Sequence, residues 1–171
     1  MLTLSVTPFD ITMPVHQFFE DVWNAEDAGD FARLQADIDE LFLPEYHNHH
    51  PLLPDQGRGR GGVAFMITSF REAFPDLRFT LEDLFSGKDR VAARWQATGS
   101  HLGPFLGAPG TGRPFVITGT SVFRVGRGKI AETWDQWDRL AFFQKLGVAA
   151  APVPFENPRY QFESSDYRRA A

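Results

Sequence analysis

Two aspartates beside two tryptophans are the feature of this sequence best suited to acid/base chemistry. They lie in the stretch AETWDQWD, which ends at Asp138. Side chains of a β-strand alternate between two faces, so Asp135 and Asp138 are expected on opposite sides of a sheet. The face of Asp135 then also takes Ala131, Thr133 and Trp137. The other face takes Ile130, Glu132, Trp134, Gln136 and Asp138.

The face of Asp135 has the composition of a ligand site. Ala131 and Thr133 are small and leave space for a ligand, and Trp137 supplies a large ring. A carboxyl group beside such a ring in a partly dry cavity has a raised pKa, nearer the range useful to a general acid or base. Asp135 is therefore a catalytic candidate. The alternative is a salt-bridge or turn carboxylate near a strand end.

The preceding strand, PFVITGTSVFRV, is predicted to line the same space. One face takes Phe115, Ile117, Gly119, Ser121 and Phe123. Gly119 lacks a side chain and is expected to open volume there. Ser121 offers a hydroxyl into that volume, and the alternative is a serine bonded to a neighbouring backbone group.

The five histidines are unevenly placed, with three of them in EYHNHHP. In an extended segment His47 and His49 share a side, and His50 faces the other way. A further imidazole, His101, ends a predicted strand. With an unperturbed pKa of about 6.5, an imidazole suits a general acid or a hydrogen-bond donor to a substrate carbonyl. A half-exposed structural histidine is the alternative.

Two cofactor motifs are suggested by the sequence and then fail on spacing. His47 and His49 are two of the ligands a metal needs, but no nearby residue supplies a third ligand or the carboxylate of a catalytic site. We predict no metal. The stretch GRGRGG lacks the Lys-Ser/Thr ending of a phosphate-binding loop and follows no hydrophobic strand. A flexible turn before a helix explains it.

Composition indicates one globular domain with an aromatic interior. The chain has 171 residues, 14% of them aromatic, including 17 phenylalanines. That is enough for one large core and for rings that line a cavity, so a hydrophobic small molecule is the expected partner. The formal charge is −5 with no basic run, which argues against nucleic-acid binding. The absence of cysteine excludes disulfides and thiolate chemistry.

No segment approaches the roughly 20 apolar residues that cross a bilayer, and the N-terminus lacks the basic start of a signal peptide. The sequence therefore predicts a soluble, cytoplasmic protein without a membrane partner.

The hydrophobic period changes from helical to extended along the chain. Helical stripes over 15–23, 31–41 and 63–74 are followed by alternating segments over 76–85, 90–101, 114–125 and 129–138 and a short closing helix over 140–146. Thr12 and Asp30 are expected to cap the first two helices, and Gly29 and Pro44 to end them. Asp138 is expected to cap the closing helix and Gly147 to end it. Helices before long antiparallel strands predict an α+β fold in which helices cover one face of a curved sheet that forms a cone.

The segment from Arg71 to Gly147 closely resembles the SnoaL-like polyketide cyclase, or ester cyclase, family. The motifs are AFPDL, RW.ATGSH.G.F.G.PGTGR, FRV..GKIAE.WD.WD and LG, with EYHNHHP....GRG upstream. The match covers roughly residues 14 to 147. We expect an N-terminal arm over 1–13, the family domain over 14–148 and a C-terminal extension over 149–171.

The resemblance implies the nuclear transport factor 2-like fold, a conical pocket and a homodimer or higher homo-oligomer. In the anthracycline-pathway cyclases of the family, the carboxylate of the WD element drives an intramolecular aldol closure without metal or organic cofactor. It corresponds to Asp135. Those cyclases have a histidine where this chain has Ser121, so His49 and His101 are the expected assisting imidazoles. The expected substrate-binding residues are Tyr46, Trp95, Ile117, Ser121, Phe123, Thr133 and Trp137.

Two classes of function are consistent with these residues. One is a cofactor-independent enzyme, of lyase or isomerase type, in which Asp135 moves a proton next to a carbonyl of a hydrophobic, polyketide-like compound. Cyclisation, isomerisation, dehydration and hydrolysis share that apparatus. The other is a non-catalytic small-molecule-binding module that keeps the pocket, and the replacement at Ser121 favours it.

Overall fold

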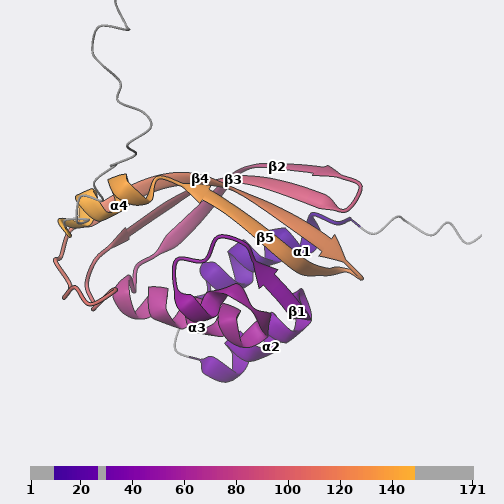
Figure 1. Ribbon diagram of the computed structural model, residues 1–171, viewed down its shortest axis with the longest axis horizontal. Coiled ribbons are helices and arrows are strands. Elements are labelled where there is room, and N and C mark those ends of the chain that lie inside the picture. Colours follow the sequence, from indigo (N-terminus) through magenta and orange to yellow (C-terminus); the bar gives the residue numbers. More distant parts are fainter. Residues whose placement is uncertain (1–9, 27–29, 149–171) are drawn as a thin grey trace, which may run out of the picture.

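A curved, open five-stranded sheet arches over the N-terminal helices (Figure 1). The computed structural model describes residues 10–26 and 30–148. Most of the expected N-terminal arm, Gly29 and the whole C-terminal extension lie outside the described residues. The strands are β1 (Phe42–Asn48), β2 (Arg78–Gly87), β3 (Arg90–Ser100), β4 (Pro114–Gly126) and β5 (Lys129–Trp137), in the order β1-β5-β4-β3-β2. The helices are α1 (Met13–Gln17), the π-helical turn η1 (Phe18–Trp23), α2 (Phe31–Leu41), the 3-10 turn η2 (Pro54–Gly57), α3 (Gly59–Ala73) and α4 (Arg139–Leu146).

The ends of the helices follow local capping chemistry. The Asp30 carboxylate accepts a hydrogen bond from the Arg33 amide at 3.0 Å and begins α2, as expected. Asp138 does the same for α4, accepting from the Ala141 amide at 2.8 Å. Gly147 ends α4 in the left-handed region, with φ of 72°. The expected cap at Thr12 is wrong, because its side chain makes no capping bond.

Helix α2 spans the predicted stripe over 31–41, but Pro44 does not end it. The chain continues directly from Leu41 as β1, and Pro44 lies within that strand. β1 pairs in parallel with β5, a pairing that an all-antiparallel sheet does not include. The glycines of GRGRGG are not a flexible turn, since α3 begins at Gly59.

A β-bulge changes the alternation at the start of β5. Glu132 pairs with Arg124 and Ile130 pairs with Val125, which leaves Ala131 as an extra residue. Ile130 is therefore fully buried in the core, not on the outer face as alternation predicted. From Glu132 onward the predicted faces hold.

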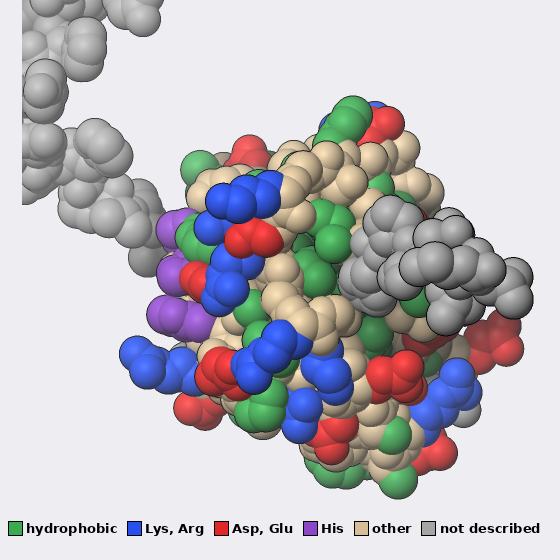
Figure 2. Space-filling view, turned by 90° about the vertical axis from the view of Figure 1, so that its right-hand side faces the viewer, with side chains coloured by type: hydrophobic (Ala, Val, Ile, Leu, Met, Phe, Trp, Pro, Cys, Tyr) green, Lys and Arg blue, Asp and Glu red, His purple; other side chains and the backbone are tan. Residues whose placement is uncertain are grey.

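The core lies between the concave face of the sheet and the helices. It is rich in aromatic contacts, among them Phe18 with Phe42 and Phe19 with Phe123. The π-helical turn η1 directs Phe18, Phe19 and Trp23 into this space. No helix within 10–26 or 30–148 is long and apolar enough to cross a bilayer. On the face in Figure 2, basic and acidic side chains are interspersed and form no continuous basic surface.

Candidate active site

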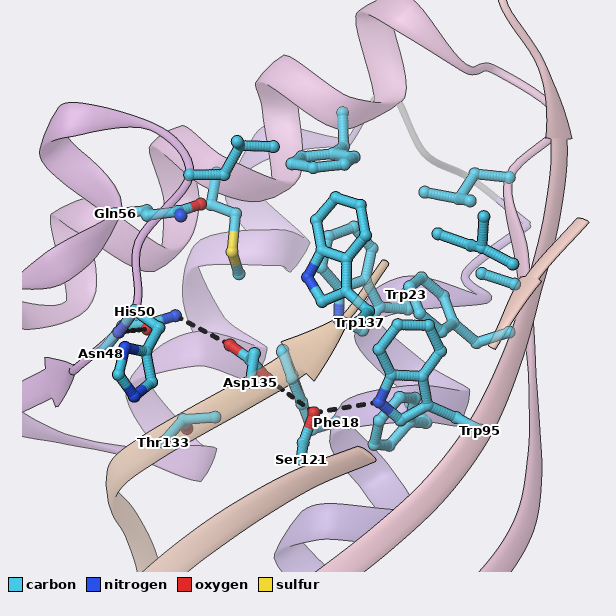
Figure 3. A pocket seen from close by; sticks show the side chains of 18 of the residues that line it. Phe18, Trp23, Asn48, His50, Gln56, Trp95, Ser121, Thr133, Asp135 and Trp137 are labelled. Atoms are coloured by element: carbon cyan, nitrogen blue, oxygen red, sulfur yellow. Dashed lines mark hydrogen bonds between the residues drawn. The ribbon is translucent and has the colours of Figure 1, made fainter. Parts of the chain in front are cut away.

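An aromatic cavity lies under the concave face of the sheet, with its polar groups gathered on one side (Figure 3). Its apolar lining comes from the helices and from β2 to β5 and consists of Phe18, Phe19, Trp23, Leu52, Met66, Phe70, Leu77, Phe79, Trp95, Ala97, Phe115, Ile117, Phe123, Trp137 and Phe142. Its polar lining consists of Tyr46, Asn48, His50, Gln56, Ser121, Thr133 and Asp135. Such a site holds a hydrophobic ligand and offers it a few polar contacts.

Asp135 is the carboxylate of this cavity. Its Oδ1 accepts a hydrogen bond from the Ser121 hydroxyl at 2.5 Å, and its Oδ2 accepts one from Asn48 Nδ2 at 3.1 Å. Burial raises the pKa of Asp135, and these two donors oppose the rise, followed by the nearby charges of Arg139 and His50. The residue as a whole is half-buried, and it lines the cavity.

Ser121 connects Asp135 to Trp95. The two strands place Ser121 directly opposite Asp135, and the indole Nε1 of Trp95 donates to Ser121 Oγ at 2.9 Å. The expected open volume at Gly119 is absent, because the Trp95 ring fills it. A Cβ built on Gly119 lies 2.4 Å from Trp95 Cζ2.

The polar lining residues that the sequence did not reveal are Asn48, His50 and Gln56. Asn48 is buried, and its Oδ1 accepts from the His50 amide at 2.9 Å, so its Nδ2 must face Asp135. The sequence pattern that could have revealed Asn48 and His50 is the same alternation that grouped His47 with His49. It places Tyr46, Asn48 and His50 together on the other side, and the parallel pairing of β1 with β5 directs that side into the cavity.

Tyr46 also lies on this side of β1 and is almost fully buried. Burial, and then the charge of Asp135, raises its pKa far above the ordinary value. Tyr46 therefore remains a neutral phenol at physiological pH and cannot serve as a base there.

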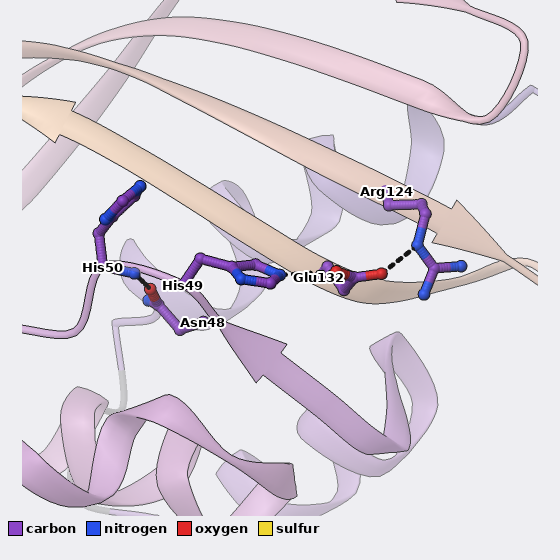
Figure 4. Close-up of polar contacts among 5 residues, drawn as sticks. All are labelled: Asn48, His49, His50, Arg124 and Glu132. Carbon is purple, nitrogen blue, oxygen red and sulfur yellow. Dashed lines mark hydrogen bonds and ion pairs between the residues drawn. The ribbon is translucent and has the colours of Figure 1, made fainter.

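His49 lies outside the cavity, which corrects its expected catalytic position. Its Nε2 lies 2.6 Å from Oε2 of Glu132 (Figure 4). Its ring also stacks on Trp134, with centroids 4.3 Å apart. Arg124 bonds to the same carboxylate, and these contacts, the His49 bond first, lower the pKa of Glu132. The reason is alternation, because Glu132 and Trp134 occupy the face of β5 opposite Asp135.

His101 is also placed away from the cavity. It is fully buried, and its Nδ1 lies 3.2 Å from Thr111 Oγ1. Thr111 uses its own proton to bond the Leu146 carbonyl at 2.8 Å, so His101 is the donor in the first contact. These two hydrogen bonds through Thr111 connect the loop after β3 to the C-terminal end of α4. His101 is thus enclosed away from the cavity and is not among the residues that line it.

The seven expected substrate-binding residues all line the cavity, although their contact with a substrate stays a prediction. Ala131, expected to share their space, does not line it. The rings of His47 and His49 are close, with centroids 4.4 Å apart. In the described part of the chain, however, no three histidine or acidic side chains come together in a way that holds a metal ion.

Comparison with known proteins identifies the family. The model for the SnoaL-like polyketide cyclases matches residues 14–146. The chain belongs to this family. It is 31% identical, over 118 residues, to the aklanonic acid methyl ester cyclase DauD of Streptomyces sp. (strain C5), an alignment that covers 65% of this chain and 70% of that protein.

Solved structures of similar proteins confirm the nuclear transport factor 2-like fold. TsrD from Streptomyces laurentii is 31% identical, with a TM-score of 0.67 over 82% of this chain and 98% of its own. IdmH from Streptomyces antibioticus is 30% identical, with a TM-score of 0.64 over 82% of this chain and 100% of its own. Membership of the family supports a cyclase or isomerase role for a protein that binds a small hydrophobic ligand.

Proposed function

We propose that this protein catalyses an aldol-type ring closure or isomerisation of a hydrophobic, polyketide-like carbonyl compound, with Asp135 as the general base. The observation that carries the proposal is a single partly exposed carboxylate in the polar lining of an aromatic cavity, with a pKa raised by burial. A base is most effective when its pKa approaches the working pH, and burial moves Asp135 in that direction.

The proposed reaction needs no atoms beyond those of the substrate. Asp135 removes a proton from a carbon next to a carbonyl group, and the electron pair of that C–H bond forms an enolate. The enolate carbon attacks a second carbonyl carbon of the same molecule, which closes the ring and leaves an alkoxide. The alkoxide takes the proton back from Asp135. The same proton transfer, returned to a different carbon, gives isomerisation.

The cavity supports this chemistry in two further ways. Its aromatic walls favour a folded substrate whose two reacting carbons lie close together, and such positioning supplies a large part of many rate enhancements. His50 is the imidazole that lines the cavity. It replaces His49 and His101 as the group proposed to donate a hydrogen bond to the enolate oxygen.

The test compares Asp135→Asn with wild type on aklanonic acid methyl ester, the compound for which the relative DauD is named. Removal of the base should lower kcat about 10²- to 10⁴-fold. The matched control is Asp138→Asn, the same chemical change three residues away at the cap of α4, where asparagine also caps well. Turnover by folded Asp135→Asn at the rate of wild type would show that Asp135 is not the base.

A non-catalytic binding module is the second candidate, favoured by Ser121 at the position where anthracycline-pathway cyclases have histidine. It predicts that wild type binds the hydrophobic carbonyl compound, measured by tryptophan fluorescence, without converting it. If chromatography detects conversion of this compound, the protein is an enzyme and not a binding module. Release of water or of an alcohol in that assay would identify a dehydratase or hydrolase that uses the same base.

A further inference from the structure

The hydrogen bonds behind Asp135 run in one direction, from Trp95 through Ser121 to Oδ1 (Figure 3). An indole N–H can donate but cannot accept, so Ser121 Oγ is the acceptor in its 2.9 Å contact with Trp95. The one hydroxyl proton of Ser121 is then left for Asp135, at a distance of 2.5 Å between the two oxygens. Oδ1 of Asp135 is therefore held in the role of acceptor.

The second carboxylate oxygen, Oδ2, has a longer contact with a neutral amide, 3.1 Å from Asn48 Nδ2. The orientation of that amide is set by the bond from the His50 amide to Asn48 Oδ1, at 2.9 Å. Each carboxylate oxygen keeps a second acceptor position. The shorter bond from Ser121 favours negative charge on Oδ1 more than the longer contact with Asn48 favours it on Oδ2, so a proton binds more readily to Oδ2. The two oxygens of Asp135 are thus not equivalent.

We propose that Trp95 is a positioning residue that acts through Ser121 and makes Oδ2 of Asp135 the oxygen that exchanges protons with the substrate. This inference rests on the proposed function and adds which atom is the base and what orients it. Oδ2 takes the proton from the substrate carbon and later returns it to the alkoxide. The hydroxyl proton of Ser121 stays on Oγ throughout, so Trp95 and Ser121 orient the carboxylate and do not carry a proton.

The backbone opposite Trp95 is adapted to this arrangement. Gly119 pairs directly with Trp95 across β3 and β4, and a Cβ on Gly119 would lie 2.6 Å from Trp95 Cη2. That separation is far below a van der Waals contact, so any other residue at 119 displaces the indole. Trp95 is 5% exposed and also packs edge-on against Phe79, with ring centroids 5.3 Å apart. Gly119 and Phe79 therefore flank the ring in the position in which its N–H reaches Ser121.

The test uses the unliganded full chain labelled with ¹⁵N in its four tryptophans, which give four indole signals. Trp95→Phe identifies the signal of Trp95. In wild type this signal should titrate with the same midpoint as the carboxyl carbon of Asp135, followed by ¹³C NMR and assigned with Asp135→Asn. Ser121→Ala should abolish the indole titration and raise the pKa of Asp135 by roughly one to two pH units, the value of a hydrogen bond to a charged group.

Trp95→Phe should raise the pKa of Asp135 by a smaller amount, about 0.1 to 0.6 of a pH unit, because it removes the bond that strengthens the Ser121 donor. The matched control is Trp23→Phe, which also removes an indole from the cavity lining but none of the bonds to Ser121 or Asp135. It should leave the titration of Asp135 in place. The inference would be overturned if the chemical shift of the Trp95 indole did not change when Asp135 ionises. It would also be overturned if Trp95→Phe and Trp23→Phe changed the pKa of Asp135 by equal amounts.

The failure of this inference can be told apart from failure of the proposed function. The NMR titration needs neither substrate nor turnover, whereas the general-base role of Asp135 is tested by the turnover of Asp135→Asn. If Trp95→Phe does not fold, the indole titration in wild type and its loss in Ser121→Ala still decide whether Trp95 is coupled to Asp135.

Discussion

Substitution of Gly119 by alanine tests the packing that holds the Asp135 site together. The new Cβ would lie 2.4, 2.6 and 2.9 Å from three carbons of the Trp95 indole. All three separations are below 3.0 Å, shorter than real Cβ contacts, so the indole must shift from the position in which it bonds Ser121. Overpacking of a core typically costs about 1–3 kcal/mol, and the lost Trp95–Ser121 hydrogen bond adds about 0.5–1.5 kcal/mol. Alanine within a strand is more favourable than glycine by roughly 0.5–1 kcal/mol, which offsets part of this cost.

The net expectation is that Gly119→Ala lowers the free energy of unfolding by about 0.5–4 kcal/mol. For a chain of this size that corresponds to a fall in Tm of roughly 1–16 °C. Urea and thermal unfolding followed by circular dichroism measure both quantities. The matched control is Gly87→Ala, a glycine of β2 where an added Cβ meets nothing within 4 Å. It should be neutral or slightly stabilising.

A double-mutant cycle identifies the cause of the loss. Phenylalanine is shorter than tryptophan and lacks the outer ring carbons that the new Cβ meets, so Gly119→Ala should cost much less when Trp95→Phe is already present. The reasoning is refuted if Gly119→Ala matches Gly87→Ala in stability, or if its cost is unchanged in the Trp95→Phe background.

Three further predictions follow from the site. His49→Gln should leave kcat within about twofold and the free energy of unfolding within about 1 kcal/mol of wild type, because His49 belongs to a partly exposed ion pair outside the cavity; a 100-fold loss of activity, measured beside Asp135→Asn, would contradict this. Thr111→Val should cost about 1–3 kcal/mol because it leaves the buried His101 Nδ1 and the Leu146 carbonyl unpartnered; an unchanged Tm would show that this link is not stabilising. Burial raises the pKa of Asp135 above 3.8, so the protonated carboxyl group stabilises the fold fully below that pH, and this contribution is lost as pH rises through the raised pKa. The free energy of unfolding of wild type should therefore fall, relative to that of Asp135→Asn, as pH rises across this window. A difference between the two proteins that is independent of pH would argue against the raised pKa.

Much of the fold could be predicted because its signals are local. The period of Val15 to Trp23 requires a helix with one apolar face, and the alternation in β4 and β5 requires strands with one buried face. The capping roles of Asp30 and Asp138 and the stop at Gly147 depend on residues within a turn of each helix end. The same alternation separates Asp135 from Asp138, and the family resemblance selects Asp135 independently.

The partners of Asp135 could not be predicted in this way. Asn48 reaches it across 87 positions of sequence, through a parallel pairing of β1 with β5 that leaves no local pattern. His49 and His101 were chosen as imidazoles near the right motifs, yet one lies on the opposite face of the sheet and the other is enclosed beside α4. The homo-oligomer expected from the resemblance likewise depends on a surface between chains and stays a prediction, which light scattering of the purified protein can test.

The sequence by itself determined the main helices, the four antiparallel strands, the faces of β5 from Glu132 onward and the place of Asp135 on one of them, because each depends on periodicity over a few residues. The tertiary structure alone decided which groups surround that carboxylate. Register places Ser121 opposite Asp135 and Gly119 opposite Trp95, and packing fills the vacant side-chain position with an indole that can donate to Ser121. Hydrogen bonds require positions defined to a few tenths of an ångström, and such positions arise when distant strands are brought into register and packed.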